Sequence, residues 1–123
     1  MGTYIEQLLA TKQHYPFDNW RAHYQQESIR QWDPDGVEDT NAVQTIFDQL
    51  IAKLIKMGEE APEKKKVKQI IKAIEATNDY AGLIMTEQAE ELVGLTDEIT
   101  VACGLDPSDY AEGAGLADEA RDW

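Results

Sequence analysis

Two histidines, a lone cysteine and a turn rich in aspartate are the residues whose types could bind a metal ion. His14 and His23 lie nine residues apart, and neither follows a glutamate at the three-residue spacing of a di-iron helix. One cysteine and two histidines do not complete a four-ligand zinc site without acidic help. The turn 33–36 resembles the middle of a calcium loop, but Gln31 and Ala42 occupy the first and last ligand positions. We therefore predict no metal site and no cofactor.

The chain also lacks the residue patterns of nucleophilic catalysis. Cys103 falls on the inner face of a predicted helix, near its C-terminal end, where the helix dipole raises the pKa of a thiol. Ser28 and Ser108 do not lie in the glycine-flanked turn that a serine nucleophile needs. Adjacent acids such as Glu90 and Glu91 point in different directions around a helix, so they do not form an acid–base pair. We predict a protein that is not an enzyme, with no catalytic residue.

The distribution of charge is the strongest compositional signal. The chain of 123 residues has a net charge of -13. Residues 1–72 hold 11 acidic and 10 basic side chains, a balance of -1, whereas residues 73–123 hold 13 acidic side chains and one base, Arg121, a balance of -12. A surface of this sign repels nucleic acid and anionic lipid and attracts a basic protein. The predicted partner is therefore a basic protein, with no direct contact to nucleic acid or membrane.

A lysine-rich stretch lies just before the acidic part of the chain. Residues 53–72 contain seven lysines and three glutamates. The simplest role for these lysines is internal neutralisation of the acidic part. A nucleic-acid site built on Lys64, Lys65, Lys66 and Lys68 is the alternative, and the negative charge of the whole chain argues against it.

Acidic side chains of the C-terminal part and two tryptophans are the candidates for a partner-binding surface. Trp32 lies beside a turn and Trp123 ends the chain, so both are harder to bury than the other large aromatics. Another interpretation stays open, because acidic residues also serve as a solvated surface and tryptophans as core. The predicted partner-binding residues are Glu87, Glu90, Glu91, Asp97, Glu98, Asp106, Asp109, Glu112, Trp32 and Trp123.

Helical periodicity dominates the elements that must position these residues. In 40–58 the apolar residues recur at steps of three and four, with Thr40 or Asp39 as the cap and Gly58 as the stop. Thr3 and Glu6 form a capping box, and residues 81–85 form a connector expected to run buried across the bundle. The remaining helices are predicted at about 4–12, 18–31, from a first turn at Pro62 to near Asn78, and 86–104, with a short helical turn at 107–112.

No strand pattern and no repeat of fixed period appears in the sequence. We therefore predict an all-α fold, with residues 1–123 forming a single-domain bundle of about five helices with short loops and a short C-terminal helical turn. The N-terminus shows no secretory leader, and no segment is apolar over the length of a membrane span. These features favour a cytoplasmic protein.

A compact, cysteine-poor and strongly acidic helical chain of this size resembles bacterial immunity proteins. The sequences TEQAEEL at 86–92, DEI at 97–99 and GLDPSD at 104–109 look like the C-terminal pattern of a bacterial family linked to such systems. The resemblance implies a protein that binds and neutralises a cognate toxin domain without catalysis. The alternative is an acidic mimic of nucleic acid, which would inhibit a DNA- or RNA-binding complex such as one used in phage defence.

Overall fold

The computed structural model describes residues 3–123, which form helices and turns and contain no strand. The all-α fold predicted from the sequence is confirmed. Five helices of seven or more residues agree with the prediction of about five. In chain order the elements are α1 (Tyr4–Ala10), the 3₁₀ turn η1 (Thr11–His14), α2 (Phe17–Tyr24), α3 (Glu27–Arg30), α4 (Gly36–Met57), α5 (Glu63–Thr77), η2 (Asn78–Tyr80), α6 (Thr86–Ala102), η3 (Pro107–Asp109), η4 (Ala111–Gly113) and α7 (Ala117–Ala120).

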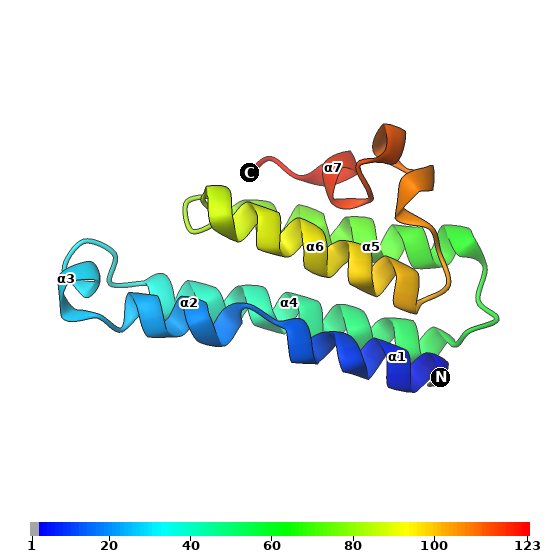
Figure 1. Cartoon of the computed structure of the whole chain (residues 1–123), viewed down its shortest axis with the longest axis horizontal. Helices are drawn as coiled ribbons and strands as arrows, with labels where there is room; N and C mark the ends of the chain where they lie inside the picture. Colours follow the sequence, from blue (N-terminus) through cyan, green and yellow to red (C-terminus); the bar gives the residue numbers. More distant parts are fainter. Residues whose placement is uncertain (1–2) are drawn as a thin grey trace.

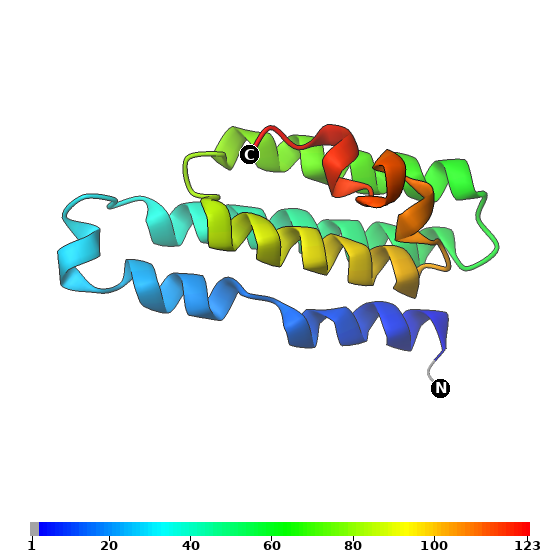
Figure 2. The same cartoon turned by 45° about the horizontal axis from the view of Figure 1, so that its top comes forward.

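Four helical segments run up and down the long axis of the bundle. The segment from α1 to α2 lies along α4 in the opposite direction, and α5 and α6 then reverse direction in turn (Figure 1). A turned view shows α6 passing over α4 between the α1–α2 segment and α5 (Figure 2). The C-terminal residues fold back over α5 and α6, and α7 packs against both helices. Among residues 3–123, no helix has the length and the apolar character needed to cross a membrane.

Helix α4 supplies the centre of the core, as its periodicity predicts. Five of its apolar side chains are buried, and Ile46 and Ile55 pack against this core at its edge. Three aromatic residues from the N-terminal segment join them, with the Phe17 ring packing edge-on against Trp20. The buried residues named here are Val43, Phe47, Leu50, Ile51 and Leu54 of α4 and Phe17, Trp20 and Tyr24 of α2.

Helix α4 begins at Gly36, four residues before the predicted cap. Thr40 is buried inside the helix, where its hydroxyl donates to the Gly36 carbonyl oxygen at 2.7 Å. Gly36 itself lies under the Tyr24 ring, because a Cβ atom placed on Gly36 would come 2.3 Å from Tyr24 Cδ1. The predicted start at Thr40 or Asp39 is wrong because this tyrosine contact holds an extra helical turn on the core.

The helix predicted over 18–31 is divided into α2 and α3. Gln26 has an extended backbone, with φ -63° and ψ 131°, between the two helices. The residues from 25 to 28 are polar and exposed, so no apolar side chain holds a continued helix on the core. The next half-buried side chain is Ile29, and the chain reverses direction around it.

The helix ends follow the predicted capping signals in most places. The capping box between Thr3 and Glu6 is present, and Gly58 ends α4 with a φ of 86°. Pro62 precedes α5 in extended conformation instead of lying within its first turn. In the connector 81–85, Leu83 and Ile84 are buried, as predicted for a segment that crosses the bundle.

Candidate partner-binding surface

One face of α6 carries four of the predicted glutamates and is open to solvent. Leu92, Leu95 and Ile99 turn the opposite face into the core. The exposed face therefore holds residues at steps of three and four along the helix. These exposed residues are Glu87, Glu90, Glu91, Gly94, Glu98 and Val101.

Two of these glutamates are held in place by the N-terminal segment. The indole N–H of Trp20 donates to Glu91 Oε1 at 3.3 Å. His14 Nδ1 lies 3.0 Å from Glu98 Oε1. Glu87 and Glu90 make no hydrogen bond or ion pair with residues 3–123, so their carboxylates are free to meet a partner.

Asp97 lies differently from the glutamates of this face. Its Oδ1 atom is buried without a hydrogen-bond partner in the described chain, and it lies 2.3 Å from where a Cβ atom would stand on Gly115. Burial raises the pKa of the Asp97 carboxyl, and the negative charge of Asp118 raises this pKa further. This oxygen of a predicted contact residue is therefore turned inward toward the C-terminal segment.

Among the predicted contact residues that follow α6, Asp106 caps a turn, whereas Asp109 and Glu112 point to solvent. Asp106 caps the turn η3, because its Oδ1 accepts the Ser108 backbone N–H at 3.0 Å and the Ser108 hydroxyl at 2.7 Å. These hydrogen bonds lower the pKa of the Asp106 carboxyl. Asp109 and Glu112 are exposed and form no ion pair within residues 3–123.

The two tryptophan candidates differ sharply in exposure. Trp32 is 88% exposed and lies two residues after the end of α3, in the turn that leads to α4. Trp123 is half-buried, its indole N–H donates to Thr77 Oγ1 at 2.8 Å, and the Arg121 guanidinium lies 5.2 Å from its ring centre. Trp32 is thus presented to solvent, whereas Trp123 fastens the C-terminus to α5.

The lysine-rich stretch does not pair with the acidic part of the chain. The ion pairs of residues 3–123 are Lys12–Asp48, Arg21–Asp18 and Arg121–Asp118, and the His14 ring contacts Glu98, which is an ion pair only when the histidine is protonated. None of them uses a lysine from 53–72, so the prediction of internal neutralisation is wrong at the level of direct contacts. The acidic face of α6 therefore keeps its charge for other interactions.

Lys66 is the member of this stretch that sequence reasoning missed. It is buried at 5% exposure, and its ammonium donates to the carbonyl oxygens of Glu59 at 2.8 Å and Cys103 at 2.9 Å. The ammonium also lies 5.0 Å from the centre of the Tyr4 ring. Because a cation at a helix C-terminus satisfies otherwise unpaired carbonyls, Lys66 caps α6 and fixes the segment that follows α4. Helical spacing could have found it, because Lys66 lies four residues before Ile70 and eight before Ile74 on the buried face of α5.

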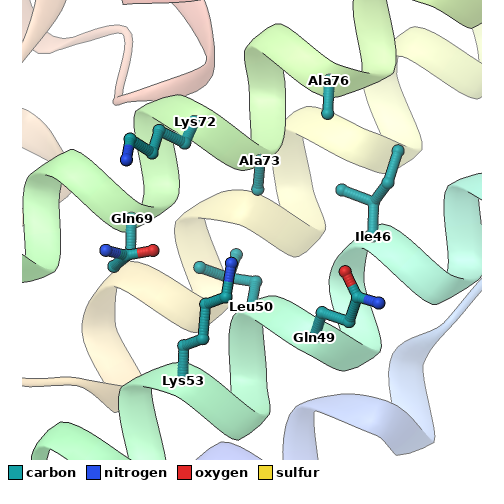
Figure 3. Close-up of a pocket in the computed structure, with 8 residues that line it drawn as sticks. All are labelled: Ile46, Gln49, Leu50, Lys53, Gln69, Lys72, Ala73 and Ala76. Carbon is teal, nitrogen blue, oxygen red and sulfur yellow. The ribbon is translucent and has the colours of Figure 1, made fainter.

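A small hollow lies between α4 and α5. Figure 3 shows Ala73 and Ala76 of α5 pointing toward α4, with Lys53 on α4 and Lys72 on α5 beside the gap. The space is about 100 Å³. This volume is below the roughly 300 Å³ at which small-molecule sites begin. We therefore attribute the gap to the small side chains of Ala73 and Ala76 and not to a ligand site.

The residues considered for metal binding and nucleophilic chemistry lie apart. Within the described residues, no group of three or more His, Cys, Asp or Glu side chains is placed to hold a metal ion. Cys103 is buried, its thiol contacts the Thr100 carbonyl oxygen at 3.3 Å, and burial raises its pKa. Comparison of the chain with protein-family models, with curated proteins and with solved structures found no match.

Proposed function

We propose that this protein is an immunity-type inhibitor that binds a basic partner, a cognate toxin domain, in the cytoplasm and blocks it without catalysis. The observation that carries the proposal is the exposed face of α6. Glu87, Glu90, Glu91 and Glu98 share this face, and no lysine or arginine of residues 3–123 forms an ion pair with any of them.

The physical support comes from how such a face behaves in solution. Carboxylates grouped on one side create a potential that speeds the encounter with a cationic surface and excludes anionic competitors. The backbone of this face is rigid, since it belongs to a helix of 17 residues whose other side is in the core. A partner would therefore meet an ordered backbone with Glu91 and Glu98 already oriented, and only the side chains of Glu87 and Glu90 would have to be ordered on binding.

The exposed tryptophan supplies the second part of the proposal. A side chain that is 88% exposed leaves a large apolar area in water, and a binding partner can cover it. Tryptophan is among the residues that dominate binding energy at interfaces. Trp32 is thus assigned as an apolar anchor, and the glutamates of α6 set orientation and association rate.

The test is a pull-down at low salt against the product of the neighbouring toxin-like gene, with growth of cells that express both proteins as the functional readout. The wild-type chain should bind and restore growth, and a double variant Glu87→Lys/Glu90→Lys should do neither. The matched control is Glu60→Lys/Glu75→Lys, which changes net charge equally at two exposed residues away from α6 and from Trp32 in sequence, and it should still bind. Absence of binding by the wild-type chain would end the proposal.

A competition experiment separates toxin inhibition from nucleic-acid mimicry. If the carboxylates stand in for phosphates, the protein and duplex DNA should exclude each other from the partner. If the partner is a toxin without a nucleic-acid channel, added DNA should leave the complex intact. If DNA displaces the protein from its partner, nucleic-acid mimicry replaces toxin inhibition as the proposed function.

A further inference from the structure

Gly94 lies in the middle of the acidic face of α6 without a structural reason for being glycine. It is exposed, and a Cβ atom placed there would meet no other atom within 4 Å. Its φ does not fall in the left-handed region that favours glycine. Glycine inside a helix is less stable than alanine, so this position lowers the stability of α6 with no gain in packing within the described chain.

A groove lies between α6 and the N-terminal segment at this glycine. It has a volume of about 370 Å³. Gly94 lines it from α6, and Tyr15 and Pro16, which connect η1 to α2, line it from the other side. Glu91 and Glu98 also line the groove. They are seven residues apart, which places them about 10 Å apart along the helix axis with Gly94 between them.

The groove is electrically unbalanced. Its lining includes two carboxylates and the amides of Gln13 and Asn19, and it includes no lysine or arginine. His14 is its one titratable base, and this histidine is already in contact with Glu98. At the other end of the groove, the Trp20 indole N–H holds the Glu91 carboxylate in place by donating a hydrogen bond to it. The acceptors are thus oriented before any ligand arrives.

We infer that this groove receives an arginine side chain of the basic partner, with its guanidinium plane against Gly94 and its N–H groups directed to one of the two flanking carboxylates, Glu91 or Glu98. A guanidinium is flat and weakly hydrated, and its fork of five donors can bind several acceptors at once. Gly94 allows the plane to approach the helix backbone, where a methyl group would stand in its path. This inference deepens the proposed function and rests on it.

The test is titration of the ¹⁵N-labelled protein with the peptide acetyl-hexa-arginine amide at 150 mM salt, followed by amide chemical shifts. The amides of residues 91–98 should shift most. Gly94→Ala should weaken the dissociation constant at least tenfold while it raises the midpoint of urea denaturation. If the variant is more stable and also binds more weakly, its weaker binding cannot result from loss of folding.

The matched control is Gly82→Ala, a second exposed glycine with open space around its Cβ position, which should leave the dissociation constant unchanged. Hexa-lysine should bind more weakly than hexa-arginine, because an ammonium lacks the planar fork. Equal affinity of the Gly94→Ala variant and the wild-type chain would overturn the inference. So would shifts spread evenly over all acidic segments, or no binding of the arginine peptide at millimolar concentration.

The same variants distinguish the groove from the proposed function. If Gly94→Ala keeps full affinity for the toxin while Glu87→Lys/Glu90→Lys loses it, the inference of arginine binding in the groove is wrong and the immunity function stands. If the wild-type chain binds the arginine peptide at the groove but not the toxin, the groove stands and the immunity function is wrong.

Discussion

Replacing Lys66 with methionine should destabilise the fold more than the same replacement at any other lysine of the lysine-rich stretch. Methionine keeps the length and apolar character of the lysine stem but removes both hydrogen bonds of the ammonium. The carbonyl oxygens of Cys103 and Glu59, at 2.9 and 2.8 Å from the ammonium, would lose their donor. The C-terminus of α6 would then lack its cap.

The size of the effect follows from the surroundings of each carbonyl. The bond to Cys103 is buried, so its oxygen would stay unpaired, which costs about 1–3 kcal/mol. The bond to Glu59 is only partly buried, and water can replace much of it. Removal of a buried charge offsets part of the loss. We therefore expect the free energy of unfolding to fall by about 2 kcal/mol in Lys66→Met.

The measurement is urea denaturation followed by far-UV circular dichroism. The control is Lys68→Met in the same helix, since Lys68 is exposed and forms no ion pair within residues 3–123. This control should stay within about 0.5 kcal/mol of the wild-type chain. Equal stability of the two variants would refute the capping role of Lys66.

Three further changes test the packing around the bundle. Because burial raises the pKa of Asp97 above its ordinary 3.8, the ionised carboxyl destabilises the fold at neutral pH and this penalty disappears once the group is protonated. Asp97→Asn should thus raise the urea midpoint at pH 7 and leave it unchanged at pH 3; a gain at both values would contradict this cause. Gly36→Ala should lower unfolding free energy by about 1–3 kcal/mol in the same assay, since its Cβ would clash with the Tyr24 ring. Trp123→Phe should lower unfolding free energy by about 1 kcal/mol through loss of the bond to Thr77, and an unchanged value would show that this bond does not hold the C-terminus.

Local signals in the sequence were sufficient for most of the helices. The apolar spacing of α4 and the capping box at Thr3 depend only on neighbours three or four residues away, and both are confirmed. The start of α4 could not be found in this way, because Thr40 is a good cap by type and Tyr24, which lies far from it in sequence, decides the outcome. The break before α3, in contrast, follows from the run of four polar residues at 25–28, which is a local feature of the sequence.

The candidate surface was predictable in charge but not in detail. Counting acids by segment indicates the sign of the α6 face, and helical spacing assigns Glu87 and Glu90 to its exposed side. The inward turn of Asp97 depends on the path of the chain near Gly115, which lies 18 residues away. Helical spacing places Lys66 on the buried face of α5 with Ile70 and Ile74, but its carbonyl partners lie at the ends of two other helices, which no local pattern identifies.

Hydrogen exchange of the complex with the toxin, compared with the free protein, tests the location of the interface most directly. The backbone amides of residues 86–101 and those around Trp32 should gain protection when the partner binds. The lysine-bearing residues 63–72 of α5 should exchange at the same rate in both states. Protection confined to α5 and the α4–α5 gap, with no change along α6, would contradict the assignment of the acidic face as the binding surface.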